Sequence, residues 1–228
     1  MSDNKYAELP GNAEKYSIEH VAVLENTPLR TRKLIFLGSS VTYGSASKGI
    51  SFADYIGARN NCTVIKEAVS GTTLVDDRED SYIARMKQIR ETEADLFICQ
   101  LSTNDASKGK PLGSIVESFD DKDFDTSTVA GAIEYIIAYA RSTWHCPIVF
   151  YTSPRYDKDA YAAMVDLLHG IADKWKISVI DMWNDDQFNA IADDQRLLYM
   201  KDAVHPTQAG YLKWWTPYIE NSLYDALG

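Results

Sequence analysis

The chain has 228 residues, 45% of them hydrophobic, with 33 acidic against 23 basic side chains and a net charge of -10 at pH 7. This length and apolar content are enough for one substantial core, so we expect a single domain. The negative charge argues against nucleic acids and anionic membranes as partners, although an acidic surface also simply keeps a protein in solution. We therefore expect a neutral rather than a polyanionic substrate.

The N-terminus and the cysteines predict the compartment. Residues 1–5 lead into no apolar segment of the signal-peptide kind, and no stretch reaches the roughly 18 to 20 apolar residues of a membrane span. Cys62, Cys99 and Cys146 are odd in number and lack the spacing of metal ligands. These features predict a cytoplasmic protein that uses neither a metal ion nor a membrane.

The first part of the chain lies outside the alternating pattern of the rest. It contains an apolar run at residues 21–24, followed by a turn signal at residues 26–28. We expect residues 1–32 to form an extended arm that packs on a domain formed by residues 33–228.

A strand is predicted at residues 34–37, and a serine-containing turn follows it directly. Ser40 lies in this turn between Gly38 and Gly44, where the end of the strand would expose its hydroxyl. A serine hydroxyl is a weak nucleophile until a neighbouring base accepts its proton. By itself, the turn is also typical of a tight connection whose serines cap the next helix. It has neither Walker spacing nor a G-x-G-x-x-G run, so nothing in it favours nucleotide binding.

Two further strands are predicted at residues 63–65 and 96–101, with a helix at about residues 80–91 between them. Gly71 follows the first of these strands and Asn104 follows the second. The backbone N–H of Gly71 and the side-chain NH2 of Asn104 are suitable hydrogen-bond donors to an oxyanion. In isolation, a turn glycine and a capping asparagine explain these residues as well.

A long polar loop is predicted at residues 106–125, next to the expected site. It is either a lid that shapes the substrate pocket or a solvated insertion without a role. Beyond it, apolar periodicity predicts helices and strands in alternation, namely helices at 126–141 and 157–174 and strands at 148–151 and 177–180.

The last candidate cluster places Asp202 three residues before His205, which Pro206 follows. In a loop, this spacing lets the carboxylate hydrogen-bond the imidazole, fix its tautomer and stabilise its protonated form. The same local sequence is also compatible with a helix-capping or a metal-binding role. Metal binding is disfavoured because no second histidine or cysteine is clustered nearby. A final helix is expected from residue 207 onward, with Trp214 and Trp215 packed in the core.

The order of these elements predicts the fold. Strands that alternate with helices indicate a parallel sheet with right-handed crossovers, and continuous apolar strands indicate burial on both faces. We expect an α/β fold, a three-layer α/β/α sandwich around a five-stranded parallel sheet of the flavodoxin-like kind. In such sheets ligands bind beyond the carboxyl ends of the strands. Ser40, Gly71 and Asn104 each follow a strand, so we expect them to meet at that edge.

Together, the four clusters resemble the SGNH hydrolase family, also called GDSL esterases, in their order and spacing. That family carries a Gly-Asp-Ser type of opening block, a glycine block, a Gly-x-Asn-Asp block and a closing Asp-x-x-His block. The resemblance spans about residues 33–215 and implies a flavodoxin-like fold with metal-free hydrolysis of esters or thioesters. It also implies that no cofactor is needed.

The resemblance implies a role for each matching residue. Ser40 would be the nucleophile, His205 the base and Asp202 the carboxylate that orients the base. The backbone N–H groups of Ser40 and Gly71 and the side chain of Asn104 would form the oxyanion hole.

Two positions depart from the family pattern. Ser39 stands where an aspartate usually precedes the nucleophile, at a position whose side chain is not catalytic. Ser102 stands where the third block usually has glycine, which predicts narrower access near Asn104. Neither departure removes a catalytic group.

We expect a serine esterase that acts on small acyl esters, in particular a carbohydrate O-acetylesterase. The chain shows no apolar lid or amphipathic surface helix suited to long-chain lipid at an interface. A lysophospholipase or an acyl thioesterase is the alternative among enzymes, and a non-catalytic ligand-binding module on the same fold is the alternative from another class. The complete set of Ser40, Asp202 and His205 argues against the binding module. The expected partner is a small-molecule or carbohydrate ester.

Overall fold

Five parallel strands form one sheet at the centre of the computed structural model, which describes residues 6–227. Their order across the sheet is β2-β1-β3-β4-β5, the order of flavodoxin-like folds. Leu34 of β1 lies opposite Val64 of β2 on one side and Leu96 of β3 on the other. The predicted fold class is confirmed. The strands are β1 (Lys33–Gly38), β2 (Thr63–Ala68), β3 (Leu96–Gln100), β4 (Ile148–Tyr151) and β5 (Ser178–Ile180).

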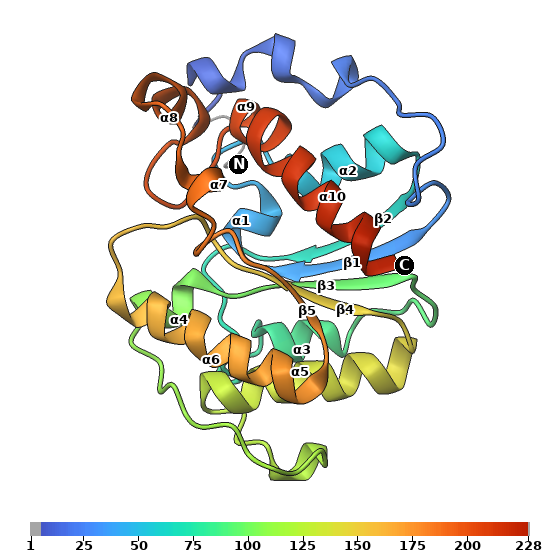
Figure 1. The fold of residues 1–228 in the computed structure, drawn as a ribbon, viewed down its shortest axis with the longest axis vertical. Coiled ribbons are helices and arrows are strands. Elements are labelled where there is room, and N and C mark those ends of the chain that lie inside the picture. Colours follow the sequence, from blue (N-terminus) through green and yellow to red (C-terminus); the bar gives the residue numbers. More distant parts are fainter. Residues whose placement is uncertain (1–5, 228) are drawn as a thin grey trace.

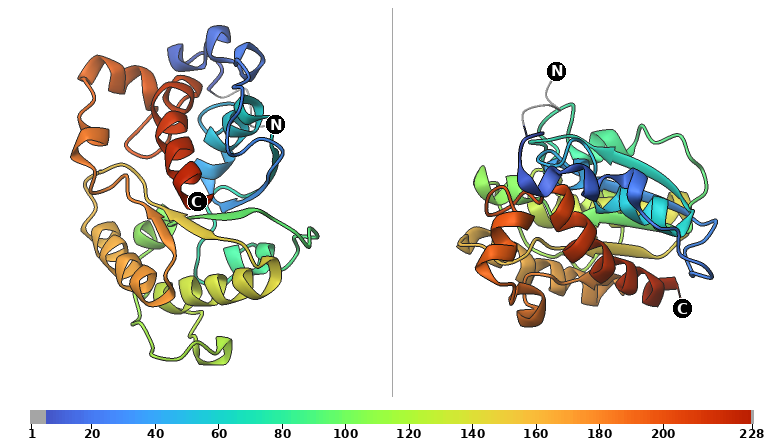
Figure 2. Two further views of the ribbon diagram at one scale, coloured as in Figure 1. Left: turned by 45° about the vertical axis from the view of Figure 1, so that its right-hand side comes forward. Right: turned by 90° about the horizontal axis from the view of Figure 1, so that it is seen from above.

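Helices cover both faces of the sheet and complete the three layers (Figure 1). One face carries α3 (Tyr82–Met86), α5 (Val129–Trp144) and α6 (Asp159–Trp175). The other carries α2 (Phe52–Asn60) and α10 (Thr216–Leu227), as the two views of Figure 2 also show. Each face has its own buried apolar cluster, and alternate residues of the strands belong to one cluster or the other. No helix within residues 6–227 is long and apolar enough to cross a bilayer.

The predicted elements differ from the observed ones mainly at the edges of the sheet and in the short helices. β3 and β4 are wholly buried, but β2 and β5 at the two edges are partly exposed because each has a neighbour on one side only. The helix predicted at residues 80–91 is confined to α3, five residues long. The short α2 was not predicted, although its Ser51–Asp54 capping box is readable in the sequence.

The C-terminal segment is a helix with a π-helical turn inside it. It runs from α9 (Gln208–Gly210) through the π turn Tyr211–Trp215 into α10. Trp215 is fully buried, and Trp214 stacks on Phe188 and donates its indole N–H to the Phe188 carbonyl oxygen at 3.0 Å. Both tryptophans therefore pack in the core as predicted.

The described part of the N-terminal arm, residues 6–32, lies over the layer that contains α2 and α10 (Figure 1). It forms three single-turn 3-10 helices, η1 (Pro10–Asn12), η2 (Glu14–Tyr16) and η3 (Ile18–His20), so the arm is not extended along its whole length. Tyr55 of α2 donates its hydroxyl hydrogen to the Tyr16 carbonyl oxygen at 2.7 Å, and Leu29 is fully buried.

The polar loop at residues 106–125 begins in α4 at the carboxyl edge of the sheet, and its middle lies along α5 and α6, away from that edge (Figure 1). Lys174 of α6 donates hydrogen bonds to the carbonyl oxygens of Val116 at 2.8 Å and Ser118 at 2.5 Å. The Phe119 ring packs edge-on against Trp175 with 4.9 Å between centroids. These contacts hold the middle of the loop on the helical layer.

Candidate active site

Ser40 lies where β1 ends, at the first residue of the single-turn helix α1 (Ser40–Tyr43). The side chain of Gln100, at the end of β3, holds this turn in place. Its Oε1 accepts hydrogen bonds from the Ser39 N–H at 2.9 Å and from the Thr42 hydroxyl at 2.8 Å. The turn requires glycine at position 38, because a Cβ there would lie 1.7 Å from the Thr42 hydroxyl oxygen.

Ser40, His205 and Asp202 form one continuous chain of hydrogen bonds. The Ser40 hydroxyl oxygen is 2.9 Å from His205 Nε2. On the other side of the ring, Nδ1 lies 2.9 Å and 3.0 Å from the two carboxylate oxygens of Asp202. This order of hydroxyl, imidazole and carboxylate is the arrangement that lets a histidine accept a serine proton.

The Asp202 carboxylate is stabilised in its charged form. Burial by itself would raise its pKa, but hydrogen bonds from His205, Lys201 and the Val204 N–H lower the pKa well below its usual value. Lys201 Nζ lies 2.9 Å from the carboxylate. Asp202 is therefore ionised at neutral pH, as the stabilisation of an imidazolium requires.

The loop that carries Asp202 and His205 is closed by backbone pairing at its base. Met200 and Pro206 form an antiparallel bridge, and the Lys201 N–H donates to the His205 carbonyl oxygen at 2.9 Å. Helix α8 (Asp193–Tyr199), which was not predicted, leads into this loop. Its last residue, Tyr199, accepts a hydrogen bond from the Thr207 N–H at 2.8 Å. The spacing of Asp202 and His205 is thus fixed by a short hairpin.

Asn104 and Gly71 lie on two adjacent segments. Asn104 is in α4 (Thr103–Ser107), directly after β3, and its side-chain NH2 donates to the Thr72 carbonyl oxygen at 2.9 Å. This bond uses one of the two amide hydrogens and fixes the direction of the other. Gly71 follows β2 with a φ of +82°, a left-handed conformation that glycine adopts without strain. An added Cβ at Gly71 would meet no atom within 4 Å, so the space beside it is open.

A cavity of about 270 Å³ opens at the Ser40 hydroxyl. Its lining combines small hydroxyl groups, an amide, one aromatic ring and a lysine. The structure brings Ser40, His205 and Asn104 to this cavity, whereas Asp202 lies behind the imidazole and Gly71 lies in the neighbouring turn. The lining residues are Ser40, Thr103, Asn104, Ser107, Tyr156, Lys158, Val204 and His205. Of the polar loop at 106–125, only Ser107 reaches the lining.

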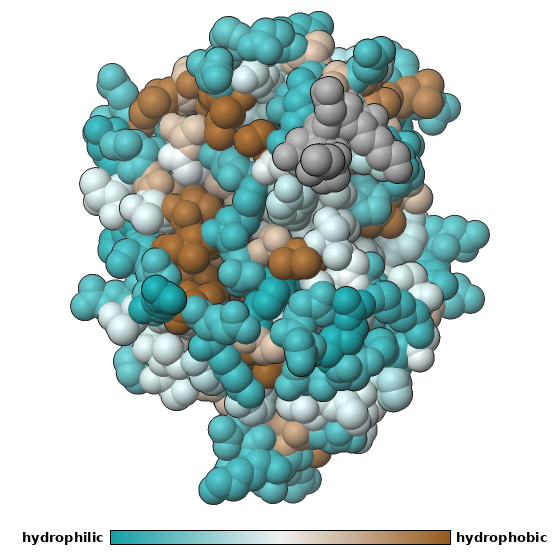
Figure 3. Space-filling view, turned by 180° about the vertical axis from the view of Figure 1, so that it is seen from behind, coloured by the Kyte–Doolittle hydropathy of each residue, from teal (hydrophilic) through white to brown (hydrophobic). Residues whose placement is uncertain are grey.

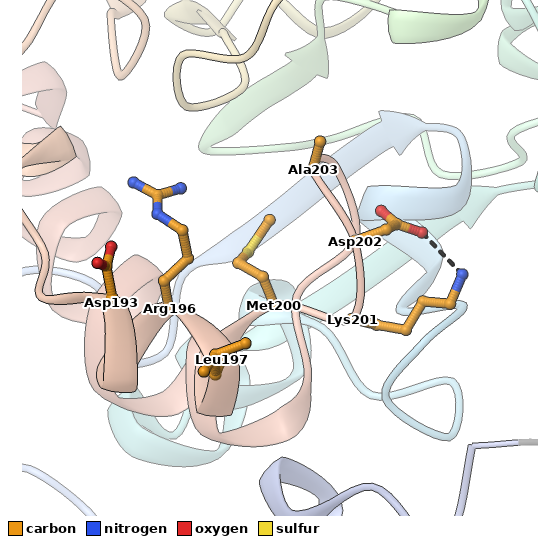
Figure 4. Close-up of a pocket in the computed structure, with 7 residues that line it drawn as sticks. All are labelled: Asp193, Arg196, Leu197, Met200, Lys201, Asp202 and Ala203. Carbon is orange, nitrogen blue, oxygen red and sulfur yellow. Dashed lines mark hydrogen bonds and ion pairs between the residues drawn. The ribbon is translucent and has the colours of Figure 1, made fainter.

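A second hollow, of about 380 Å³, lies on the other side of the Asp202 loop (Figure 4). Leu197, Met200 and Ala203 contribute the apolar part of its lining. Leu197 is 83% exposed at this hollow. The charged groups around it are Asp193, Arg196, Lys201 and Asp202.

Two buried charged residues that sequence reasoning missed hold the segments of the site together. Asp105 accepts hydrogen bonds from the N–H groups of Leu74 at 2.9 Å and Val75 at 3.1 Å, and burial raises the pKa of its carboxyl. Arg85 of α3 donates to the carbonyl oxygen of Gly38 at 2.9 Å and to the hydroxyl of Thr72 at 3.0 Å. Asp105 could have been noticed because it follows Asn104 in the sequence. No local pattern indicates the role of Arg85, because its partners Gly38 and Thr72 are distant along the chain.

Within residues 6–227, no three His, Cys, Asp or Glu side chains come close enough together to hold a metal ion. The three cysteines are free thiols, and burial raises the pKa of Cys62 and of Cys146 to about 11.

Comparison with known proteins finds similarity to lipases and acylhydrolases. The family model described as GDSL-like Lipase/Acylhydrolase matches residues 36–213. No curated protein matches the sequence significantly.

Solved structures share the fold at low sequence identity. A protein from Lactobacillus plantarum is 18% identical, with a TM-score of 0.69 over 86% of this chain and 98% of that one. A member of the lipolytic protein G-D-S-L family from Veillonella parvula is 16% identical, with a TM-score of 0.60 over 83% and 96% of the two chains. A lipase/acylhydrolase from Enterococcus faecalis is 18% identical, with a TM-score of 0.55 over 85% and 96%.

Proposed function

This chain belongs to the GDSL-like lipase/acylhydrolase family, and on that premise we propose that it is a serine esterase for small acyl esters. The observation that carries the proposal is the chain of hydrogen bonds from Ser40 through His205 to Asp202, at the mouth of a cavity. An ester that enters this cavity lies beside both Ser40 and His205, which line it.

The reaction begins when His205 Nε2 accepts the Ser40 proton as the serine oxygen attacks the ester carbonyl. The imidazolium that forms is stabilised by the ionised Asp202 at Nδ1. His205 then donates the proton to the departing alcohol, which leaves an acyl group on Ser40. Water, deprotonated by the same imidazole, attacks the acyl-enzyme and releases the carboxylic acid.

The oxyanion of each tetrahedral intermediate is held by the N–H groups of Ser40 and Gly71 and by the free amide hydrogen of Asn104. Asn104 is oriented for this task by its bond to the Thr72 carbonyl oxygen, which is adjacent to Gly71. The fold holds these donors in position before the reaction begins. They therefore stabilise the negative charge as it develops without having to reorganise first.

We propose a carbohydrate O-acetylester as the substrate. A cavity of about 270 Å³ suits a short acyl group, and the hydroxyls of Thr103, Ser107 and Tyr156 suit a polyhydroxy alcohol. On the face opposite Figure 1, hydrophobic side chains gather in small areas separated by hydrophilic ones, so that face offers no broad apolar surface for lipid (Figure 3).

A lysophospholipase or an acyl thioesterase is the second candidate. The observation that favours it is the apolar hollow beside Asp202, where Leu197 and Met200 offer a surface for a longer acyl chain (Figure 4).

Hydrolysis of p-nitrophenyl acetate, butyrate and octanoate tests the proposal, with wild type, Ser40→Ala and a control, Ser142→Ala, at an exposed serine on α5. We expect acetate to be the best substrate, Ser40→Ala to be inactive and Ser142→Ala to match wild type. A preference for octanoate favours the second candidate. If a fluorophosphonate fails to label Ser40 and no ester is cleaved, the chain is a binding module and the proposal is wrong.

A further inference from the structure

The N-terminal arm inserts one buried asparagine between the two segments that carry the nucleophile and the base. We propose that this residue, Asn12, is a positioning residue that sets the distance between Ser40 and His205. The inference rests on the proposed function, because it concerns the alignment of the same pair of groups.

Asn12 uses every hydrogen-bonding group of its side chain. It is fully buried at the end of η1. Its side-chain NH2 donates to the Ala46 carbonyl oxygen at 2.7 Å and to the Tyr6 carbonyl oxygen at 2.8 Å. Its Oδ1 accepts the Gln208 N–H at 2.9 Å. A single amide thus joins three separate stretches of chain.

The Ala46 end of this link leads directly to the nucleophile. Ala46 lies in the loop that follows α1, and the N–H groups of Gly44 and Ser45 both donate to the Ser40 carbonyl oxygen at 3.0 Å. The arm holds the loop a second time, since Lys48 Nζ donates to the Asn12 carbonyl oxygen at 2.8 Å. A displacement of this loop therefore moves the turn that carries Ser40.

The Gln208 end leads to the base. Gln208 is the first residue of α9 and lies three positions after His205. Thr207, directly before Gln208, contacts α8: its hydroxyl donates a hydrogen bond to the Leu198 carbonyl oxygen at 2.8 Å. The hairpin is joined to α8 on one side and to α9 on the other, so the Asn12 bond to Gln208 holds one of its two supports.

The arm fits this place closely. Gly11, next to Asn12, has no room for a side chain, because an added Cβ would lie 2.2 Å from the Leu198 carbonyl oxygen and 2.3 Å from the Thr207 hydroxyl oxygen. Contact of this kind places the backbone of the arm against the end of α8 and the start of α9. The arm is therefore a third support of the hairpin that holds His205.

A second link joins the same two segments without the arm. Tyr211, in the π turn after α9, donates its hydroxyl hydrogen to the Val41 carbonyl oxygen in α1 at 2.6 Å. With a single link, the two segments could still rotate relative to each other about that link. Two links at different places fix the relative orientation of the segments. We therefore expect Asn12 and Tyr211 to act together on the alignment of Ser40 and His205.

The test compares Asn12→Ala with Asn60→Ala, a matched control. Asn60, the last residue of α2, is equally buried and makes three side-chain hydrogen bonds, to Ile56 of α2 and to Glu220 and Tyr224 of α10. None of these partners lies in the loop after α1 or in α9. Both variants are compared with wild type at a temperature where all three are folded by circular dichroism. We measure kcat and KM for p-nitrophenyl acetate and the rate constant of fluorophosphonate labelling of Ser40.

We expect Asn12→Ala to lower kcat and the labelling rate by about 10- to 100-fold with little change in KM, the range that a misplacement of about 1 Å produces. Asn60→Ala should leave both rates at the wild-type level once folded. Asn12→Asp keeps the acceptor for Gln208 but loses both donors, so it should resemble Asn12→Ala if the Ala46 link matters. In the double variant with Tyr211→Phe, the loss in kcat should exceed the product of the two single losses.

Equal rates for folded Asn12→Ala and wild type would overturn the inference while leaving the esterase proposal intact. Equal losses in Asn12→Ala and Asn60→Ala would also overturn it, because the effect would then be a general consequence of removing a buried amide. An unreactive wild type, by contrast, contradicts the proposed function itself.

Discussion

At the scale of single residues, the site depends on side chains whose orientation other groups impose. Asn104 shows this most directly, because its amide is fixed by the Thr72 carbonyl oxygen before any substrate arrives. A donor that is already in place stabilises developing charge without first having to reorganise.

Replacement of Asn104 by alanine should lower kcat by about 10² to 10³, the usual loss for one oxyanion donor. KM should change little, because the bond is strongest in the tetrahedral intermediate. Steady-state kinetics on p-nitrophenyl acetate check this, with the exposed Asn184→Ala as control. Activity within threefold of wild type would remove Asn104 from the oxyanion hole.

Replacement of Asp202 by asparagine should lower kcat by about 10⁴, as expected when the carboxylate that orients a catalytic histidine loses its charge. The variant should keep the fold, since asparagine has the same shape. A variant that stays fully active would show that His205 needs no ionised partner.

The lowered pKa of Asp202 predicts that the stability of the protein depends on pH, and the same substitution tests this. The folded pKa of Asp202 lies below its unfolded value of about 3.9, so its ionised form stabilises the folded state above that pH. This contribution is lost as the pH falls through the folded pKa. Urea denaturation should therefore show wild type more stable than Asp202→Asn at pH 7, with the difference shrinking below about pH 4. A difference that is constant from pH 7 to pH 2 would contradict this.

At the scale of elements, the carboxyl ends of the strands are tied to one another by buried polar side chains. Gln100 holds the turn after β1, Asp105 holds the segment at residues 74–75, and Arg85 joins Gly38 to Thr72. Buried polar groups of this kind are costly when a partner is lost, because the remaining group is neither hydrogen-bonded nor hydrated. These side chains therefore link the strand ends to one another.

Replacement of Arg85 by methionine should lower the free energy of unfolding by about 2 to 5 kcal/mol, because the carbonyl oxygens of Gly38 and Glu67 lose a buried donor. Arg78→Met is the control, since Arg78 pairs with Asp80 at the surface and should cost less than about 1 kcal/mol. Urea titrations of the two variants compare them. Equal destabilisation would show that the contacts of Arg85 contribute no more than a surface pair.

At the scale of the whole molecule, the sheet joins the two apolar clusters into one unit. Along β1, Leu34 and Phe36 belong to the cluster beneath α2 and α10, while Ile35 and Leu37 belong to the one beneath α5. A strand buried on both faces has this alternation, so neither cluster can lose its packing without exposing the same strand.

Replacement of Trp215 by alanine should lower the stability of the molecule by about 3 to 5 kcal/mol, the usual loss for a large buried aromatic side chain. Trp215 is fully buried and packs against Phe52, Tyr151 and Tyr211. Unfolding should remain a single transition, with coincident curves from circular dichroism and from loss of esterase activity. Two separate transitions would show that the faces unfold independently.

The sequence by itself determined the layers of the molecule and the positions of the candidate catalytic residues along the chain. Apolar runs about the length of a strand, separated by amphipathic helices, are local patterns, and they define a parallel sheet whatever the details of packing. Ser40, Gly71 and Asn104 could be placed at one edge because the ends of parallel strands meet there.

Only the tertiary structure decided how those residues are held. The bonds of Asn12 to Ala46 and Gln208 span 34 and 196 residues, and that of Arg85 to Gly38 spans 47. The path of residues 106–125 along α6 likewise depends on Lys174, more than 50 residues away. Local sequence has no pattern for such contacts, because they depend on which side chains the completed fold brings together.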